Sequence, residues 1–288
     1  MTGLRAVLAA AAADLSAAGV VSAEHDARAL AQHVLAVPKP SDLLLVDGFS
    51  ADELAAFRAL VTRRARREPL QHLTGRTAFR YIELEVGPGV FVPRPETEAV
   101  VQWALDAARA EGWPAALVVD LCTGSGTMAF ALANELAGAT VHGVERDPGA
   151  LAWARRNAER LAAAGDPVVT LHLGSAEDAL PELDGRVDLV VSNPPYVATT
   201  EAHLPDPEVV DHDPEVALFA GEDGLDVIRL VEQGARRLLR PGGLVVVEHS
   251  DRQGDSAPAV FTGTGAWSEV ADHPDLTGRD RFVTARRR

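Results

Sequence analysis

From about residue 96 onward, short apolar runs alternate with longer amphipathic stretches, and this alternation constrains the fold more than any other feature of the chain. The runs are rich in β-branched residues, which is typical of strands, and the stretches between them have helical spacing. Because strands that alternate with helices form a parallel sheet covered on both faces, we predict an α/β domain. The predicted strands are 116–121, 140–144, 168–173, 187–191 and 244–248, and the predicted helices are 125–136, 148–163 and 225–239.

Two further apolar runs, 267–271 and 281–285, complete the predicted sheet. No long helix separates them, so they lack the crossover that a parallel pair requires and are expected to pair antiparallel at an edge. The predicted domain, residues 96–288, therefore contains a seven-stranded, mostly parallel sheet whose last strand is antiparallel.

The chain before this domain has a different character. Residues 1–75 place apolar side chains at helical spacing, and Pro38 and Pro40 end the second helix because their rings prevent further helical hydrogen bonding. This segment is predicted to be a small helical domain. In residues 76–95, apolar residues alternate around Gly87-Pro88-Gly89, which predicts a β-hairpin linker that turns at these three residues.

The charge balance restricts the partners. The 288 residues carry a formal net charge of −15, which disfavours nucleic acid as a direct partner, because proteins that bind it usually have a basic surface. Two arginine clusters run against this balance: Arg63–Arg67 in the helical segment and Arg286–Arg288 at the end of the chain. The favoured interpretations are a solvated helix face for the first and a frayed tail for the second.

The expected location is the cytoplasm. Cys122 is the only cysteine, so no disulfide can form within the chain, as is usual in a reducing compartment. No apolar run approaches the roughly 18 residues that a transmembrane helix needs, so no membrane partner is expected. The alanine-rich start is predicted to form an amphipathic helix rather than a secretory signal.

A glycine-containing motif follows the first predicted strand and opens a helix: Asp120-Leu121-Cys122-Thr123-Gly124-Ser125-Gly126. Glycines let a ligand approach the backbone, and the start of a helix offers free N–H groups. Glu145 ends the next strand, where a carboxylate can accept both ribose hydroxyls of an adenosine group. This motif alone leaves a nicotinamide-dependent oxidoreductase open as an alternative.

A second motif, Ser192-Asn193-Pro194-Pro195-Tyr196, follows a buried strand and should face the same crevice at the carboxyl ends of the strands. Pro194 and Pro195 donate no N–H, so the local backbone offers only carbonyl acceptors, and Asn193 adds a side-chain carbonyl. Together these groups can accept both hydrogens of an –NH₂ group. Tyr196 offers a flat face for a planar acceptor. The alternative interpretation of the motif is a rigid turn at the strand exit.

The remaining polar residues predict no further chemistry. The histidines are scattered along the sequence without metal-ligand spacing, so no metal site is expected. They are His72, His142, His172, His203, His212, His249 and His273, among nine in the chain. The acidic triplet Asp211-His212-Asp213 is interpreted as a solvated loop.

The Asn-Pro-Pro-Tyr motif after the fourth strand resembles methyltransferases that modify nitrogen in a conjugated system. Further stretches resemble one branch, the peptide chain release factor N(5)-glutamine methyltransferases of the PrmC/HemK type. These stretches are residues 69–75, 91–98, 213–214, 217–218, 221–224, 241–243 and 248–249. The resemblance covers essentially the whole chain and implies a Rossmann-like class I methyltransferase domain behind a helical domain that docks the substrate.

The resemblance also implies an activity, a cofactor and site residues. S-adenosylmethionine would donate a methyl group to the glutamine amide in the Gly-Gly-Gln motif of release factors, by direct displacement without a strong base. The alternatives are a DNA or RNA amino-methyltransferase and a non-catalytic scaffold. The cofactor-binding residues would be Asp120, Cys122, Thr123, Gly124, Ser125, Gly126, Glu145 and Asn193, with Arg94–Glu98 nearby, and Asn193 to Tyr196 would hold the glutamine amide.

The sequence departs from the family pattern at two places. Members of the family commonly carry an acidic residue that packs by the adenine, and the resemblance implies that this role is displaced here to Glu177 or Asp178, or is lost. Cys122 stands where the family often has glycine, which is expected to be tolerated only if its backbone φ is negative.

Overall fold

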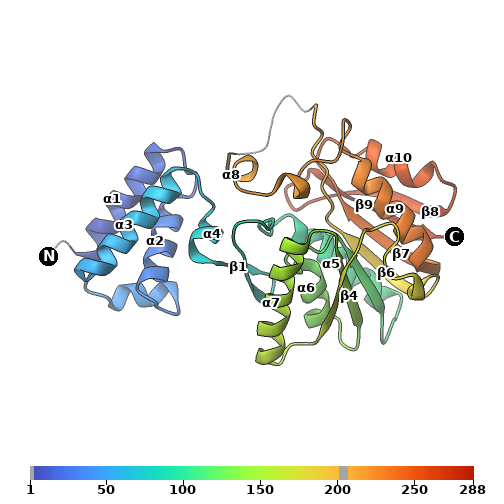
Figure 1. The fold of residues 1–288 in the computed structure, drawn as a ribbon, viewed down its shortest axis with the longest axis horizontal. Helices are drawn as coiled ribbons and strands as arrows, with labels where there is room; N and C mark the ends of the chain where they lie inside the picture. The colour runs from blue at the N-terminus through green and yellow to red at the C-terminus, as the bar shows by residue number, and fades with distance from the viewer. Residues whose placement is uncertain (1–2, 201–206) are drawn as a thin grey trace. The chain divides into compact units, whose positions relative to one another are not determined.

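The computed structural model describes residues 3–200 and 207–288, and the chain divides into two compact units (Figure 1). Unit 1 comprises Met1–Arg76 together with Pro205–His212, and unit 2 comprises Thr77–Leu204 together with Asp213–Arg288. Within the described ranges, no helix has the length and apolar character needed to cross a membrane.

Unit 1 is helical, as predicted. Its apolar core gathers side chains from the first three α-helices, with Leu15, Leu30 and Phe57 almost fully buried. The side chain of Ser50 accepts a hydrogen bond from the backbone of Glu53 and begins the third α-helix with a capping box. The elements are α1 (Leu4–Ala17), α2 (Ala23–Val34), the 3₁₀ helix η1 (Pro40–Leu45), α3 (Ala51–Ala65), α4 (Leu70–Thr74) and α8 (Pro207–Val210).

The interpretation of the arginine cluster Arg63–Arg67 as a solvated helix face is wrong for Arg64 and Arg67, whereas Arg63 and Arg66 are exposed. Arg64 is 7% exposed and donates hydrogen bonds to Asp26 at 2.7 Å and Glu208 at 3.0 Å. Arg67 also donates to Glu208, at 2.7 Å. Although partial burial raises the pKa of Glu208, these hydrogen bonds hold it at about 2. A buried guanidinium needs such carboxylates, and they come from remote parts of the sequence.

Unit 2 contains the predicted seven-stranded sheet, in the order β5-β4-β3-β6-β7-β9-β8. The first five of these strands are parallel to one another, and β9 is antiparallel to both β7 and β8, as predicted. The strands are β3 (Leu117–Leu121), β4 (Thr140–Glu145), β5 (Val169–Leu173), β6 (Val187–Ser192), β7 (Leu239–Glu248), β8 (Trp267–Pro274) and β9 (Asp280–Arg287).

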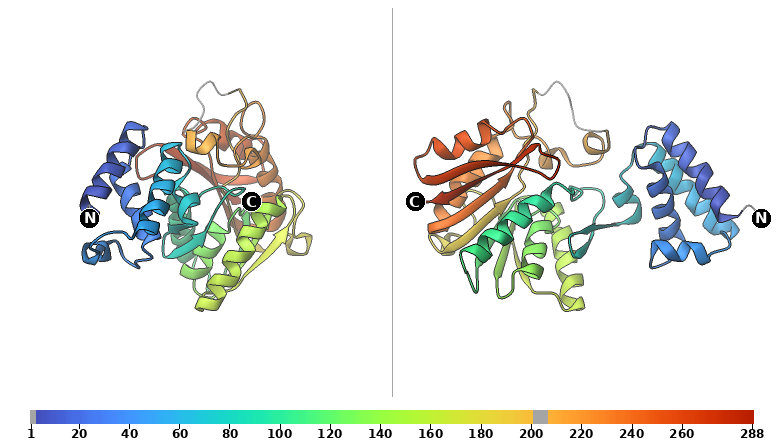
Figure 2. Two further views of the ribbon diagram at one scale, coloured as in Figure 1. Left: turned by 60° about the vertical axis from the view of Figure 1, so that its left-hand side comes forward. Right: turned by 180° about the vertical axis from the view of Figure 1, so that it is seen from behind.

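Helices cover both faces of this sheet (Figures 1 and 2). One face packs against α5 (Thr97–Ala110), α6 (Thr127–Glu135) and α7 (Pro148–Ala164). The opposite face packs against α9 (Asp226–Leu238) and α10 (Ser256–Thr262). The helices α5 and α10 go beyond the predicted elements. The seven residues of α10 are too few to show a helical period, whereas α5 buries Val100, Val101, Ala104, Leu105 and Ala108 at helical spacing.

The β-hairpin exists, but the predicted turn is wrong. Strands β1 (Arg76–Phe79) and β2 (Ile82–Glu85) form a two-stranded sheet, and Gly87–Gly89 follow the second strand instead of separating the two. The turn lies at Arg80, whose φ of 51° is stabilised by a hydrogen bond from its backbone N–H to Glu98 at 3.2 Å.

The arginines at the end of the chain are ordered, so the interpretation as a frayed tail is also wrong. Arg286 lies in β9 and donates to Glu111 at 2.7 Å and to Glu269 at 2.9 Å. Arg288 donates to the carbonyl oxygen of Trp267 at 2.6 Å. These hydrogen bonds connect the last strand to β8 and to the end of α5.

Candidate active site

The glycine motif forms the loop between β3 and α6, and its two glycines have different roles. Gly126 has φ of 90°, and a Cβ there would meet the ring of Phe130 at 2.0 Å, so the loop closes tightly on its own helix. Gly124 has φ of 58°, and a Cβ there would meet nothing within 4 Å. The backbone at Gly124 therefore borders open space that a ligand can approach.

Asp120 is a buried residue whose carboxylate is hydrogen-bonded to this loop and to the helix that follows it. Its Oδ2 accepts hydrogen bonds from the hydroxyl of Thr123 at 2.6 Å and from the backbone of Ala129 at 3.1 Å. Complete burial raises the pKa of the Asp120 carboxyl to about 7, despite these two donors. Its Oδ1 is buried and has no hydrogen-bond partner among the described residues. The loop thus keeps one acceptor that a ligand N–H group could satisfy.

Glu145 lies beside the loop at the end of β4. Its Oε2 accepts from the backbone of Gly124 at 2.9 Å, and its Oε1 accepts from the backbone of Asp147 at 2.8 Å. Burial raises the pKa of this carboxyl, and the backbone donors partly offset that effect. Because each carboxylate oxygen has two lone pairs, both oxygens can still accept a hydroxyl. The structure therefore brings together Gly124 and Glu145, which are 21 positions apart.

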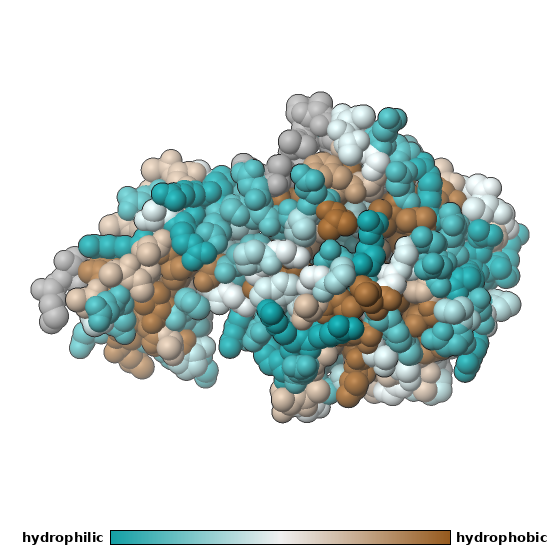
Figure 3. Space-filling view, in the orientation of Figure 1, coloured by the Kyte–Doolittle hydropathy of each residue, from teal (hydrophilic) through white to brown (hydrophobic). Residues whose placement is uncertain are grey.

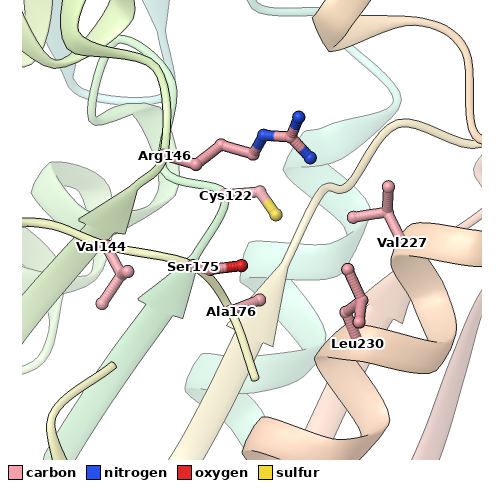
Figure 4. Close-up of a pocket in the computed structure, with 8 residues that line it drawn as sticks. Cys122, Val144, Arg146, Ser175, Ala176, Val227 and Leu230 are labelled. Carbon is pink, nitrogen blue, oxygen red and sulfur yellow. The ribbon is translucent and has the colours of Figure 1, made fainter. Parts of the chain in front are cut away.

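A pocket opens beside Cys122 (Figure 4). It lies between the strand ends and α9, and the side chains of Cys122, Ser175 and Leu230 point toward it. Neither Glu177 nor Asp178 lines it, and Glu177 instead accepts a hydrogen bond from the Ser175 hydroxyl. The lining residues are Cys122, Val144, Arg146, Gly174, Ser175, Ala176, Val227 and Leu230.

Several of these pocket residues were not among the predicted site residues. Val227 and Leu230 belong to α9, far from any recognisable motif, and only the packing of that helix on the sheet brings them to the pocket. Arg146 directly follows Glu145, and this position after a strand is the one feature of the sequence that could have identified it as a pocket residue. Residues 174–176 follow β5 and could have been found by the rule that ligands bind at the carboxyl ends of parallel strands.

The expectation that Cys122 has a negative φ is wrong. Its φ is 62°, in the left-handed region that glycine adopts most easily. Burial also raises the pKa of its thiol far above the ordinary value, so the side chain is a neutral thiol. A non-glycine residue in this conformation costs about 1–3 kcal/mol, which the surrounding fold must offset.

Replacing Cys122 with glycine should therefore give a more stable protein than replacing it with alanine. We expect Cys122→Gly to have a free energy of unfolding about 1 kcal/mol higher than Cys122→Ala, because alanine retains the backbone strain and both variants remove the thiol. Chemical denaturation of the two variants measures this difference. Equal stability would mean that the left-handed conformation is not strained in the folded protein.

The Asn-Pro-Pro-Tyr motif lies immediately after β6. The hydroxyl of Ser192 donates to the carbonyl oxygen of Leu121 at 2.7 Å and links the ends of β6 and β3. The side-chain Nδ2 of Asn193 donates to the hydroxyl oxygen of Thr97 at 3.1 Å. Within the described ranges, no donor reaches Oδ1 of Asn193 or the carbonyl oxygen of Pro194. Two acceptors are thus available at the end of this strand.

Tyr196 is fixed by its surroundings. Its hydroxyl donates to Oε1 of Glu248 at 3.4 Å, and its carbonyl oxygen accepts from the side chain of Gln253 at 3.2 Å. Burial raises the pKa of the phenol, and the nearby charge of Glu248 raises it further. Tyr196 is therefore neutral, and its ring packs partly buried against one core cluster.

Asp213 is not part of a solvated loop, so that interpretation is wrong for this residue. Its side chain is fully buried, and it accepts a hydrogen bond from the Arg94 guanidinium at 2.6 Å. A second hydrogen bond, from the backbone of Val92, measures 3.4 Å. The Arg94–Glu98 stretch is thus fastened to a segment more than a hundred residues away in sequence.

The described residues contain no group of three or more histidine, cysteine or acidic side chains that could hold a metal ion. Two histidines do come together. Nδ1 of His142 and Nε2 of His172 are 3.0 Å apart on the neighbouring strands β4 and β5, a proximity that their sequence separation does not reveal. His203 lies outside the described residues.

Comparisons with known proteins agree on the family. The domain family described as "PrmC N-terminal domain" matches residues 6–75, and one described as "Methyltransferase domain" matches residues 114–275. The release factor glutamine methyltransferase of Streptomyces coelicolor is 54% identical over 287 residues, which cover 100% of this chain and 99% of that protein. Relatives from five other organisms, 42–50% identical over at least 96% of this chain, carry the same name.

Two further similarities concern substrates and fold. A 4-amino-L-phenylalanine/4-methylamino-L-phenylalanine methyltransferase of Streptomyces pristinaespiralis is 44% identical over 94% of this chain and 90% of that protein. The catalytic domain of hMettl16, crystallised with a 3′UTR hairpin, superposes with a TM-score of 0.54 at 15% identity. That match covers 71% of this chain and 75% of the other, and it supports the methyltransferase fold alone.

Proposed function

The chain belongs to the family of release factor glutamine methyltransferases, and from this premise we propose that it methylates the glutamine side-chain amide in the Gly-Gly-Gln motif of peptide chain release factors. One observation carries the proposal. Asn193 engages Thr97 through its amide N–H group, so its oxygen remains available as an acceptor beside the carbonyl of Pro194. Two fixed acceptors suit an –NH₂ group, whose two hydrogens they can hold.

The proposed cofactor is S-adenosylmethionine, which supplies a methyl group on a positively charged sulfur. The residues present suit its parts. The open backbone at Gly124 and the unpartnered Oδ1 of Asp120 would accommodate the methionine end. Glu145 would accept the ribose hydroxyls, and the pocket that includes Ser175 and Ala176 would take the adenine. Thr123, Ser125 and Gly126 shape the loop, and Glu177 would act through the hydrogen bond that it accepts from Ser175.

The chain's own part in the reaction is to position the acceptor. An amide nitrogen is a poor nucleophile because its lone pair is delocalised into the carbonyl group. Oδ1 of Asn193 and the carbonyl of Pro194 would each accept one amide hydrogen and fix the nitrogen in place. Their partial negative charges favour the positive charge that develops on the nitrogen as the new bond forms. Tyr196, with Pro195 before it, would provide the flat surface on which the planar amide lies.

We assign the helical residues 1–75 to substrate docking, residues 76–95 to a linker, and residues 96–288 to methyl transfer. A release factor is a folded protein, and the helical unit exposes apolar side chains that a protein surface could cover (Figure 3). Leu44 and Leu45 in η1 are each 85% exposed, and Val21 is 99% exposed. We place the enzyme in the cytoplasm, where translation occurs, and we expect no direct contact with nucleic acid.

Intact-mass spectrometry tests the function. A purified release factor incubated with the enzyme and S-adenosylmethionine should gain the mass of one methyl group, and fragmentation should locate it on the Gly-Gly-Gln glutamine. A release factor with glutamate in place of that glutamine is the matched control and should gain nothing. Methylation of an RNA hairpin or of 4-aminophenylalanine, with an unmodified release factor, would contradict the proposal and identify the acceptor class instead.

A further inference from the structure

Gln253 is a buried side chain in the loop between β7 and α10, and it is 6% exposed. Its Oε1 accepts a hydrogen bond from the backbone of Ser250 at 3.0 Å. Its Nε2 donates to three backbone carbonyl oxygens, those of Tyr196 at 3.2 Å, Gly224 at 3.2 Å and Asp223 at 3.4 Å. Because a donor faces one end of this amide and acceptors face the other, its orientation is fixed.

The three carbonyl groups belong to two segments of the chain. One is the acceptor loop, residues 193–196, which is proposed to hold the substrate amide. The other is the turn 223–224 directly before α9, the helix that lines the pocket beside Cys122. Ile228 and Val231 of α9 are fully buried in the core, so this turn is a fixed reference for the acceptor loop. Gln253 thus connects the proposed acceptor site to the segment that leads into the proposed cofactor pocket.

Gly224 permits this close approach of the two segments. Its φ is 72°, and a Cβ there would meet the carbonyl oxygen of Tyr196 at 2.4 Å and Nε2 of Gln253 at 2.8 Å. Any side chain at this position would therefore push the acceptor loop away from the turn. The glycine and the glutamine together allow three backbone carbonyl groups to converge on one donor.

Backbone hydrogen bonds hold the end of the acceptor loop from a second side. The N–H group of Val197 donates to the carbonyl oxygen of Leu218 at 2.8 Å, and its carbonyl oxygen accepts from the backbone of Ala220 at 2.9 Å. The hydrogen bond from Gln253 comes from a side chain, so its contribution to the position of the loop can be measured by substitution.

We propose that Gln253 is a positioning residue that sets the distance between the acceptor loop and the methyl donor. The inference rests on the proposed function, because it assigns what holds the loop that would bind the acceptor amide. Buried carbonyl oxygens need a donor, and without the amide of Gln253 the three oxygens would separate or take up water. The acceptor loop would then move relative to α9. A displacement of about 1 Å at the reacting atoms costs about 100-fold in rate.

Gln253→Met tests the proposal, because methionine has a similar shape but donates no hydrogen bond. We expect kcat for release factor methylation to fall about 10- to 100-fold. The KM for the release factor and the affinity for S-adenosylmethionine should stay within about threefold of wild type, since the loss concerns the alignment of the reacting groups. Steady-state kinetics and isothermal titration calorimetry measure these quantities. Gln253→Glu should lose more, because an ionised carboxylate would face the same three carbonyl oxygens.

Gln102→Met is the matched control for the loss of a glutamine amide. Gln102 lies on the exposed surface of α5, where its Nε2 donates to Asp106 at 3.0 Å. Its replacement should leave both kcat and KM at their wild-type values.

Gly224→Ala tests the same contact from the opposite side. The added Cβ should displace the acceptor loop, so kcat should fall as in Gln253→Met. The double variant should be no slower than the slower single variant, because both substitutions break one contact. Gly165→Ala is the matched control. Gly165 ends α7 with φ of 95°, and a Cβ there would meet nothing within 4 Å. This control should lose stability through backbone strain alone and keep wild-type kcat.

Hydrogen exchange provides a readout that does not depend on activity. In Gln253→Met, the amide of Val197 should exchange about tenfold faster than in wild type, because a displaced acceptor loop weakens its hydrogen bond to Leu218. In Gly165→Ala, where the strain lies elsewhere, this amide should keep its wild-type rate. Equal acceleration in the two variants would show that the loop opens when the whole protein unfolds, and it would overturn the positioning role.

The outcomes separate this inference from the proposed function. Wild-type kcat in Gln253→Met, or a loss confined to KM, would overturn the positioning role while release factor methylation stands. A double variant whose loss is the product of the two single losses would also overturn it. If wild-type enzyme leaves release factors unmethylated, the proposed function fails instead, and the exchange rate of Val197 still tests whether Gln253 fixes the acceptor loop.

Discussion

Replacing Asn193 with alanine should lower kcat for release factor methylation by about 100- to 1,000-fold, equivalent to about 2.7–4 kcal/mol in the transition state. The substitution removes one of the two acceptors that hold the amide nitrogen, and the hydrogens of the acceptor amide would lose a fixed partner. Affinity for S-adenosylmethionine should change little, since the glycine loop and Glu145 remain intact. Single-turnover methylation and equilibrium cofactor binding, measured on the same preparation, test both expectations.

Asn134→Ala is the matched control for this experiment. Asn134 donates to Asp166 at 2.7 Å on the exposed surface, at the end of α6 away from the glycine loop, so its loss should leave kcat unchanged. If Asn193→Ala retained wild-type turnover, the acceptor role of Asn193 would be wrong, and with it the argument that assigns an –NH₂ substrate to this site.

The sequence predicted the parts of the site that depend on local order along the chain. In a parallel sheet, the loops after the strands meet at one edge, so motifs that directly follow strands had to converge. On this basis the sequence alone predicts that Gly124, Glu145 and Asn193 lie at one end of the sheet. The structure adds the hydrogen bond between Gly124 and Glu145.

The supporting groups could not be predicted in the same way. Thr97 and Glu248 reach Asn193 and Tyr196 only because α5 packs beside β6 and because β7 pairs with β6 in one register. A hydroxyl in a helix start or a glutamate at a strand end carries no sign of its partner in the sequence. Contacts of this kind arise from packing between remote elements, which local pattern does not encode.

The wrong interpretations have a common cause. Arg64, Asp213 and Arg286 were each interpreted as solvated, because an isolated charge in a sequence is usually exposed. In the structure each meets an oppositely charged side chain that is remote in sequence: Glu208, Arg94 and Glu111. Charges of opposite sign that converge from distant segments can pair in the folded protein. Such partners cannot be identified from the sequence, because they are not neighbours along the chain.

Replacing Glu145 with alanine should weaken S-adenosylmethionine binding by more than 100-fold. A hydrogen bond to a charged group contributes about 1.5–3 kcal/mol, and two ribose hydroxyls would lose their acceptor. Glu145→Gln keeps one acceptor oxygen and should lose less. Because burial raises the pKa of Glu145, the wild-type affinity should also fall as the pH decreases and the carboxyl becomes protonated. Isothermal titration calorimetry across pH measures both effects.

A cofactor analogue that lacks the ribose 2′-hydroxyl distinguishes ribose binding from damage to the loop. Glu145 also accepts from the backbone of Gly124 and of Asp147, so its removal could disorder the glycine loop without any role in ribose binding. If Glu145 holds the ribose, wild type should prefer S-adenosylmethionine over the analogue, and Glu145→Ala should lose most of that preference. An unchanged preference would show that the carboxylate maintains the loop and that another group binds the ribose.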